Sequence, residues 1–136
     1  MFVFIRISHF KPINRHFTLT KDLFNHLSNN RPIATCKPDR LPDDDGGHLI
    51  ASIFKGSGDI DNLLPMNSQI NRSGGKWYNM EQEWLAALRK KPPETVSVNI
   101  EPVYKNDSMR PDRFIVKYSI ADGDFKRTII KNQKGG

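Results

Sequence analysis

The segment from Lys76 to Lys90 constrains the fold more than any other part of the chain. Gly74 and Gly75 precede it and Pro92 follows it, and these residues mark where a helix can begin and end. Apolar residues recur inside the segment at intervals of three and four, so they share one helical face. These residues are Trp77, Met80, Trp84, Leu85 and Leu88. The pattern predicts an amphipathic helix with one buried side.

Glu81 lies inside this apolar stripe. Burying an unpaired carboxylate is costly, so Glu81 needs a partner. A metal-bound water would supply one, and so would a basic side chain. The structural alternative is a carboxylate at the edge of the stripe that pairs with a lysine. Glu83 points to another side of the helix and is expected to be solvated.

The remaining segments favour strands. Strands are expected at residues 1–7, 95–104, 113–120 and 125–130, with a hairpin turn at residues 121–124. Thr20 is a candidate cap for a further short helix, and residues 49–54 fit either a short helix or a buried strand. Residues 62–66 look extended, and the tail from Lys131 is expected to fray. The outline is an α+β fold in which an antiparallel sheet backs a short unit of strand, loop and helix.

Size and charge narrow the class of protein. The 136 residues suffice for one domain, and the net charge of +6 favours contact with polyanions. No apolar run approaches the roughly 20 residues of a membrane helix, and residues 1–7 lack the flanks of a signal peptide. The chain as it stands is therefore expected in the cytoplasm, without a membrane partner. The single cysteine, Cys36, excludes an internal disulfide and a cysteine-based zinc site.

The chemistry is concentrated in residues 43–71. An aspartate run and a pair of glycines precede His48, and several side-chain amides follow it. Carboxylate and amide oxygens are hard ligands that suit Mg²⁺, and a neutral histidine is the usual base for water near pH 7. Together these groups predict metal-assisted phosphodiester hydrolysis. A lone histidine beside glycines is more often structural, so the prediction depends on the whole set.

Each group has an expected role in such a reaction. His48 would be the base, Asn71 would hold the metal through its amide oxygen, and Glu81 would orient the metal's waters. For Asn71 the structural alternative is a helix cap or a loop amide. Neighbouring side chains would support these groups, and arginines would bind the phosphate through paired N–H donors. The supporting candidates are Asp45, Asn62 and Asn67, and the arginine candidates are Arg72, Arg110 and Arg113.

Several of these elements, in this order, resemble a known family. Asp45-Gly46-Gly47-His48, followed by Asn62-Leu63-Leu64-Pro65, Asn71, Trp77 and Glu81, is similar to the DNA/RNA non-specific endonucleases of the ββα-metal class. Within that class it resembles the C-terminal nuclease domains of LXG-type bacterial toxins. The resemblance implies a ββα-metal nuclease domain over residues 37–134, backed by an antiparallel sheet. Residues 1–36 would form an N-terminal strand and helix segment of uncertain role.

The resemblance also implies roles for individual residues. The family's general base corresponds to His48, its metal-binding asparagine to Asn71, and its acidic residue after the tryptophan to Glu81. The asparagine of the Asn-x-x-Pro element corresponds to Asn62, which is grouped here with the catalytic residues as a supporting one. Gly46 stands where the family motif has an arginine, so another arginine must bind the phosphate. Arg110 is the first candidate for that catalytic role.

The family further implies a cofactor and partners. Its members cut DNA, and often RNA, with Mg²⁺, for which Mn²⁺ is the alternative. As toxins they leave the cell through a type VII secretion system, act in the cytoplasm of a target cell and pair with an immunity protein. We weigh two alternatives to an active nuclease: an inactive remnant that binds nucleic acid, and a protein whose main role is to engage an immunity partner.

Overall fold

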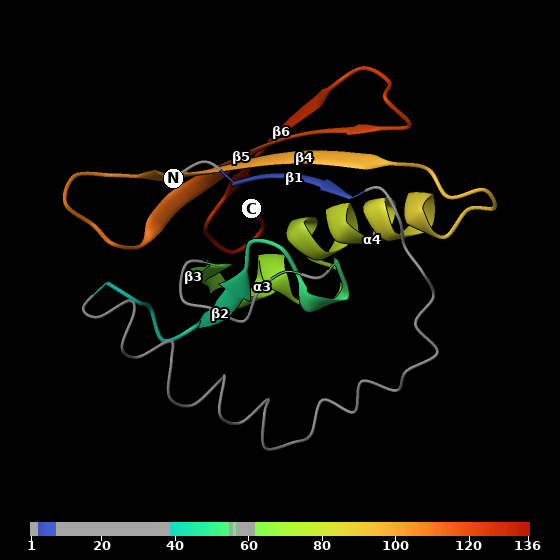
Figure 1. Ribbon diagram of the computed structural model, residues 1–136. Coiled ribbons are helices and arrows are strands. Elements are labelled where there is room, and N and C mark those ends of the chain that lie inside the picture. Colours follow the sequence, from blue (N-terminus) through green and yellow to red (C-terminus); the bar gives the residue numbers. More distant parts are fainter. Residues whose placement is uncertain (1–2, 8–38, 55, 57–61) are drawn as a thin grey trace.

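In the computed structural model, the described residues are 3–7, 39–54, 56 and 62–136, of which 3–7 are described by their backbone. They form two antiparallel sheets and one long helix, and both the helix and the smaller sheet lie against the same side of the larger sheet (Figure 1). The larger sheet lies at the top of Figure 1, and the helix lies beneath it. The smaller sheet lies beside the start of this helix and contacts the larger sheet directly. This arrangement confirms the expected α+β class.

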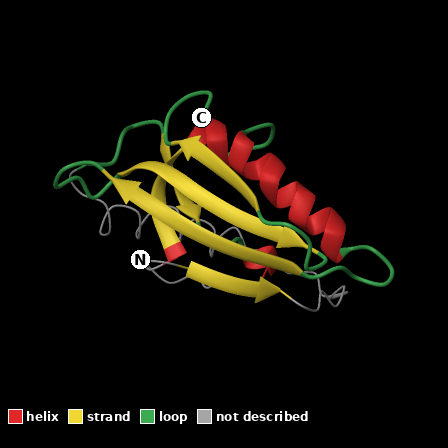
Figure 2. Cartoon of the chain, turned by 90° about the horizontal axis from the view of Figure 1, so that it is seen from above, coloured by secondary structure: helices red, strands yellow, loops and turns green. Residues whose placement is uncertain are grey.

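The larger sheet has the strand order β1-β4-β5-β6. Its strands are β1 (Val3–Ile7), β4 (Val96–Tyr104), β5 (Pro111–Ile120) and β6 (Lys126–Lys131). Seen from above, they run side by side, with β1 and β6 at the two edges (Figure 2). The expected strands and the hairpin between β5 and β6 are therefore confirmed. The predicted division of the chain at residue 37 stays a prediction, although β1 pairs with β4 along its whole length.

The smaller sheet carries most of the residues with predicted chemistry. Strand β2 (Asp44–His48) pairs with β3 (Leu63–Asn67), so that His48 lies opposite Leu63. A short 3-10 turn, η1 (Ser52–Phe54), follows β2, and this resolves the ambiguity over residues 49–54 in favour of a helical turn. The short helix α3 (Ser68–Asn71) follows β3 directly. The helix expected near Thr20 lies outside the described residues.

Helix α4 (Lys76–Leu88) confirms the segment predicted from the apolar stripe. All the stripe residues are buried, and Trp77 and Trp84 are fully so. The Trp77 ring meets Phe114 of β5 edge-on at 5.0 Å, and the Trp84 ring meets Tyr118 at 5.6 Å. The core therefore lies between α4 and the lower face of the larger sheet. No helix among the described residues is long and apolar enough to span a membrane.

The C-terminal tail does not fray as expected, because Asn132 is a buried connector. Its side-chain amide donates hydrogen bonds to the carbonyls of Pro65 and Pro111, each at 2.9 Å. Its side-chain oxygen accepts from the backbone N–H of Asn67 at 2.7 Å. These bonds join β3 of the smaller sheet to β5 of the larger one. The prediction of a loose tail was wrong because a polar residue in a tail gives no sequence signal of burial.

We predict that Asn132→Ala destabilises the fold by about 3 kcal/mol. It removes a set of buried hydrogen bonds and leaves two carbonyls and one N–H without partners. Urea unfolding followed by tryptophan fluorescence measures the change. Gln133→Ala is the control, since Gln133 is exposed and such a substitution changes stability by about 0.5 kcal/mol or less. Equal stability of the two variants would contradict the connector role.

Candidate active site

His48 stands at the end of β2, where the chain leaves the sheet. Its side chain is half-buried, and burial lowers the pKa of its imidazole below the ordinary value of 6.5. The ring is therefore neutral at pH 7 and able to accept a proton. Gly47, just before it, packs against Met66 of β3. A Cβ at position 47 would lie 2.7 Å from the Cβ of Met66, so this close pairing of the strands needs a glycine.

Asn62 fixes the backbone just after His48. Its side-chain amide donates to the carbonyl of Ile50 at 2.8 Å and accepts from the Ile50 N–H at 3.0 Å. The Asn62 carbonyl also accepts from the N–H of Leu49 at 2.9 Å. Asn62 therefore holds the turn that places His48. Its observed contacts are those of a positioning residue.

Asp45 connects β2 to the end of α3. Its Oδ2 accepts a hydrogen bond from the side-chain amide of Asn71 at 3.0 Å. The same carboxylate accepts two bonds from Arg72, at 3.1 Å from Nε and 2.8 Å from Nη2. Because the amide nitrogen of Asn71 is held by Asp45, its Oδ1 points away from that carboxylate. The Arg72 guanidinium and the Asn71 amide contribute to a lowered pKa at Asp45, against the raising effect of burial.

Asn67 shapes the helix that carries Asn71. Its side-chain oxygen accepts from the N–H of Gln69 at 3.1 Å, which caps α3. Its amide nitrogen donates to Asp43 at 2.7 Å. The cap role weighed as an alternative for Asn71 thus belongs to Asn67. Asn71 is the last residue of α3.

Glu81 carries the largest electrostatic perturbation among the candidate residues. Burial beside the core raises the pKa of its carboxyl to about 7, and the nearby indole of Trp77 offsets this in part. The Trp77 Nε1 is buried and forms no well-aligned hydrogen bond within the described part of the chain. Glu81 forms no ion pair with any described basic residue. The lysine pairing considered for Glu81 is made instead by Glu83, which bonds Lys126 at 2.8 Å and Tyr118 at 2.6 Å.

The donor set suits a hydrated hard cation. Within residues 39–54, 56 and 62–136, no group of three or more His, Cys, Asp or Glu side chains is placed to hold a metal. A dedicated zinc or calcium cage of such ligands is therefore absent from this part of the chain. What β2 and α3 do offer is a neutral amide oxygen, on Asn71, with its orientation fixed. Mg²⁺ keeps several waters and accepts few protein ligands, so this arrangement fits it.

The elements that carry these groups adjoin one another. Helix α3 packs against both β2 and α4. The Asp45–Asn71 bond links α3 to the strand of His48 directly, and His48 lies about 10 Å further along that strand. Glu81 belongs to the helix that starts after the turn at residues 72–75. The convergence of His48, Asn71 and Glu81 on one ion stays a prediction.

The structure gives the arginine candidates different surroundings. Arg110 forms a paired contact of 2.7 Å to each oxygen of Asp44 and also donates to the carbonyl of Asn132, and its role in binding phosphate stays a prediction. With 13% of its side chain exposed, Arg110 commits its Nε and Nη2 donors to the fold. Arg113 pairs with its neighbour Asp112 at 3.0 Å. Arg72 is 71% exposed and its Nη1 has no partner in the described part of the chain.

Comparison with known proteins identifies the family to which this chain belongs. Residues 6–122 match the family described as DNA/RNA non-specific endonuclease. The chain belongs to this family. The expectation of a nuclease enzyme is confirmed at that level, and the family match begins well before residue 37.

Relatives and a solved structure agree with this assignment. The chain is 49% identical over 85 residues to the type VII secretion system protein EssD of Staphylococcus aureus, strains USA300 and NCTC 8325. That match covers 60% of this chain and 14% of EssD, so the chain spans about one seventh of that relative. The structure of Sda1 nuclease with bound zinc ion superposes with a TM-score of 0.59 at 26% identity, covering 69% of this chain and 41% of Sda1. The fold of this endonuclease family is thereby confirmed.

We predict that Glu81→Gln stabilises the metal-free protein at high pH. The carboxyl has a pKa of about 7 when folded and 4.5 ordinarily, so its ionisation opposes folding. This cost is absent below pH 4.5, grows between pH 4.5 and 7, and above pH 7 amounts to about 3 kcal/mol. Thermal unfolding at pH 4 and pH 8 in EDTA measures it.

Glu83→Gln is the matched control on the same helix. Contacts with Lys126 and Tyr118 lower the pKa of Glu83, so its ionised form favours folding. This variant should lose stability at pH 8, where Glu81→Gln gains it. A pH-independent effect of Glu81→Gln would contradict the burial of an uncompensated carboxylate.

Proposed function

We propose that this domain hydrolyses phosphodiester bonds of DNA, and of RNA, with a Mg²⁺ ion held by Asn71. The observation that carries the proposal is the hydrogen bond from the Asn71 amide to Asp45. It directs a neutral carbonyl oxygen away from Asp45 and fixes it there, which is how supporting contacts orient metal ligands. The zinc ion bound in the Sda1 structure supports a divalent cation as the cofactor, and Mn²⁺ is the alternative to Mg²⁺.

His48 has the properties of the general base. Its imidazole is neutral at pH 7 because burial lowers its pKa, and Asn62 fixes the backbone that follows it. His48 accepts a proton from the attacking water as that water adds to phosphorus. A base of this kind contributes about 10²–10⁴-fold to the rate.

Glu81, Arg72 and the cation would bind and stabilise the phosphate and the water around it. Bound Mg²⁺ supplies charge stabilisation to the phosphate and to the leaving oxygen. Glu81 accepts hydrogen bonds from water around the site, and its ionised form is stabilised by the nearby positive charge. Arg72 takes the place of the arginine missing at Gly46. Its Nε and Nη2 are bonded to Asp45, which leaves Nη1 of this exposed side chain to donate to a phosphate. Arg113 is the weaker candidate, because its side chain points to the side of the larger sheet opposite α4.

The likeness to EssD supports a proposal for the biological setting. EssD is a type VII secretion system protein, and this chain resembles a short part of it. We infer that the domain is the toxic part of a bacterial antagonism system, that it acts in the cytoplasm of a target cell, and that an immunity protein neutralises it. The likeness to LXG-type toxins belongs to this proposal.

The inactive-remnant alternative is favoured by one feature, the glycine at position 46 in place of the motif arginine. Plasmid cleavage separates the two proposals. The purified chain is incubated with supercoiled plasmid and Mg²⁺, with and without EDTA. We expect cutting that EDTA abolishes, whereas intact plasmid after long incubation with Mg²⁺ would support the remnant.

We predict that His48→Ala lowers the cleavage rate by about 10²–10⁴-fold without changing the Tm by more than a few degrees. Asn79→Ala is the control, because Asn79 is an exposed amide on α4. For the unaltered protein the rate should be high at pH 7 to 8 and should fall as His48 becomes protonated below pH 6.5. Cutting by His48→Ala at the unaltered rate would show that the base is another group.

A further inference from the structure

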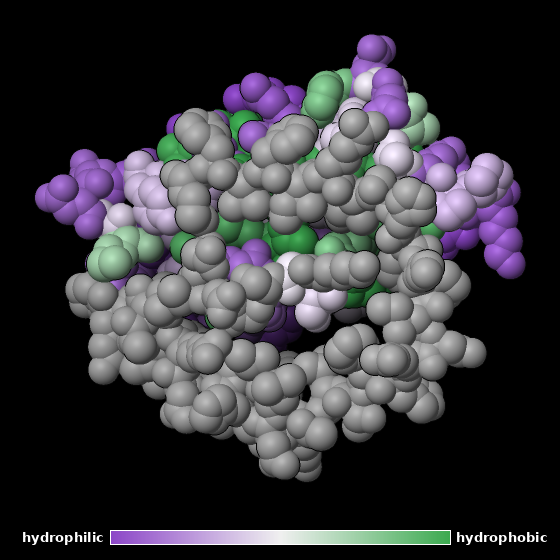
Figure 3. All heavy atoms as spheres, in the orientation of Figure 1, coloured by the Kyte–Doolittle hydropathy of each residue, from purple (hydrophilic) through white to green (hydrophobic). Residues whose placement is uncertain are grey.

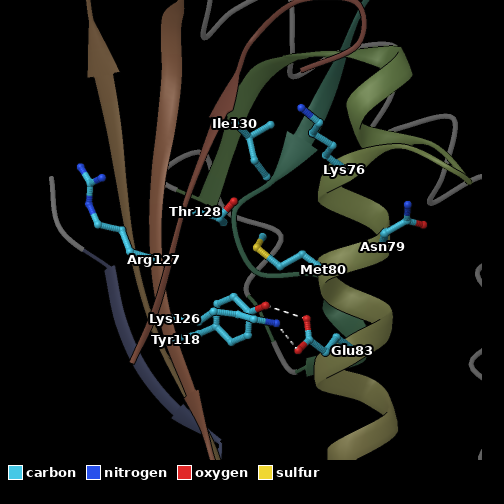
Figure 4. Close-up of a pocket in the computed structure, with 9 residues that line it drawn as sticks. All are labelled: Lys76, Asn79, Met80, Glu83, Tyr118, Lys126, Arg127, Thr128 and Ile130. Atoms are coloured by element: carbon cyan, nitrogen blue, oxygen red, sulfur yellow. Dashed lines mark hydrogen bonds and ion pairs between the residues drawn. The ribbon is translucent and has the colours of Figure 1, made fainter. Parts of the chain in front are cut away.

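The two faces of the larger sheet differ in character. Alternate residues of β5 and β6, such as Phe114, Val116 and Ile130, face α4 and are buried. The residues between them point to the opposite side, because side chains alternate along a strand. Figure 4 shows this for β6, where Lys126 and Ile130 lie toward α4 and Arg127 points away from it.

This opposite side carries like charges in cross-strand register, and we call it the outer basic face. Lys117 of β5 lies opposite Arg127 of β6, and Arg113 lies opposite Lys131. Directly opposed side chains have Cβ atoms about 4.5–5.5 Å apart, and like charges in such positions destabilise a sheet. The pair between them, Ile115 and Ile129, is uncharged. The outer basic face is defined by Arg113, Ile115, Lys117, Arg127, Ile129 and Lys131.

Few anions offset these cations. Arg113 pairs with Asp112, and Glu101 of β4 lies next to Ile115 on the neighbouring strand. Lys117, Arg127 and Lys131 form no ion pair with any residue in the described part of the chain. All three are exposed. In the space-filling view, hydrophilic and hydrophobic residues stand side by side along the top of the molecule (Figure 3). The described part of the chain therefore offers no partner for these three charges.

We propose that the outer basic face is a second nucleic-acid site, which binds the phosphate backbone without cutting it. The two like-charge pairs are four residues apart along their strands, or about 13 Å, so they contact separate phosphates. Such contacts are sequence-independent and release counterions. This proposal goes beyond the proposed catalysis and does not depend on it.

An acidic protein fits this face less well. The centres of protein interfaces are enriched in aromatic residues, Met and Arg and depleted in Lys. The centre here is the Ile115–Ile129 pair, with Ile129 45% exposed, and no aromatic residue of β5 or β6 points to this side between the two charged pairs. Regularly placed cations on a rigid sheet instead match a repeating polyanion.

The outer basic face is remote from the candidate active site. Helix α4 and the β2–β3 layer lie on the other side of the sheet (Figure 1). Nucleic acid held on the outer basic face therefore leaves His48 accessible. The face would keep a long polymer close to the enzyme between cuts and would not help with a substrate too short to reach both sides.

The test measures binding apart from cutting. The Lys117→Gln/Arg127→Gln variant is prepared in the His48→Ala background, and its affinity for a fluorescent 30-base-pair duplex is measured by anisotropy in EDTA across a salt series. Loss of two phosphate contacts should reduce the slope of log K against log salt by about 1.8. The same variant should have a higher Tm, because the opposed charges no longer repel each other.

Arg89→Gln/Lys91→Gln is the control with the same change in charge, since both residues are exposed at the far end of α4. It should leave the slope nearly unchanged. An unaltered slope for the Lys117/Arg127 variant, or an equal reduction in the control, would overturn the proposal; in the first case an acidic protein becomes the better occupant. With His48 restored, the Lys117/Arg127 variant should have a raised KM for plasmid and an unaltered kcat/KM for a short duplex. Failure of the unaltered chain to cut would contradict the proposed catalysis and leave the binding result standing.

Discussion

The buried ion pair between Asp44 and Arg110 connects the two halves of the molecule. Asp44 begins β2 and its side chain is fully buried, while Arg110 precedes β5. Removing one partner of such a pair leaves an uncompensated buried charge, which costs about 3–5 kcal/mol. Arg110 also holds the carbonyl of Asn132, whose side chain bonds β3 and β5. The strand of Asp45 and His48 is thereby fixed relative to the sheet and to α4.

These contacts hold the side chains of the candidate site in fixed positions, including a buried carboxyl that is unfavourable when ionised. Glu81 sits beside the apolar core, where its ionised form is disfavoured and its pKa is raised to about 7. A cation close to Glu81 would stabilise its ionised form. Asn71 is held by Asp45 in the same way, so its oxygen is oriented before any ligand arrives. Ionised Glu81 therefore lowers the free energy of unfolding, and we propose that a cation bound beside it offsets this cost.

Much of the fold was predictable because it depends on local patterns. The spacing from Trp77 to Leu88 gave α4, and alternation gave β4, β5 and β6. Contacts between distant residues were not predictable, since no local pattern marks them. Asn132 therefore looked like part of a loose tail, and Arg110 looked free to bind phosphate. At the site, sequence order identified His48, Asn71 and Glu81 as candidates, whereas the bond from Asp45 that orients Asn71 needed the structure.

Calorimetric titration of Mn²⁺ tests the central claim most directly, with Asn71→Ala compared to the unaltered protein and to Asn79→Ala. The claim is that the oriented amide oxygen of Asn71 is the protein's own metal ligand. It predicts at least about tenfold weaker binding for Asn71→Ala, comparable to the loss of a metal-site contact, and unchanged binding for Asn79→Ala. Unchanged Mn²⁺ affinity in Asn71→Ala would contradict it.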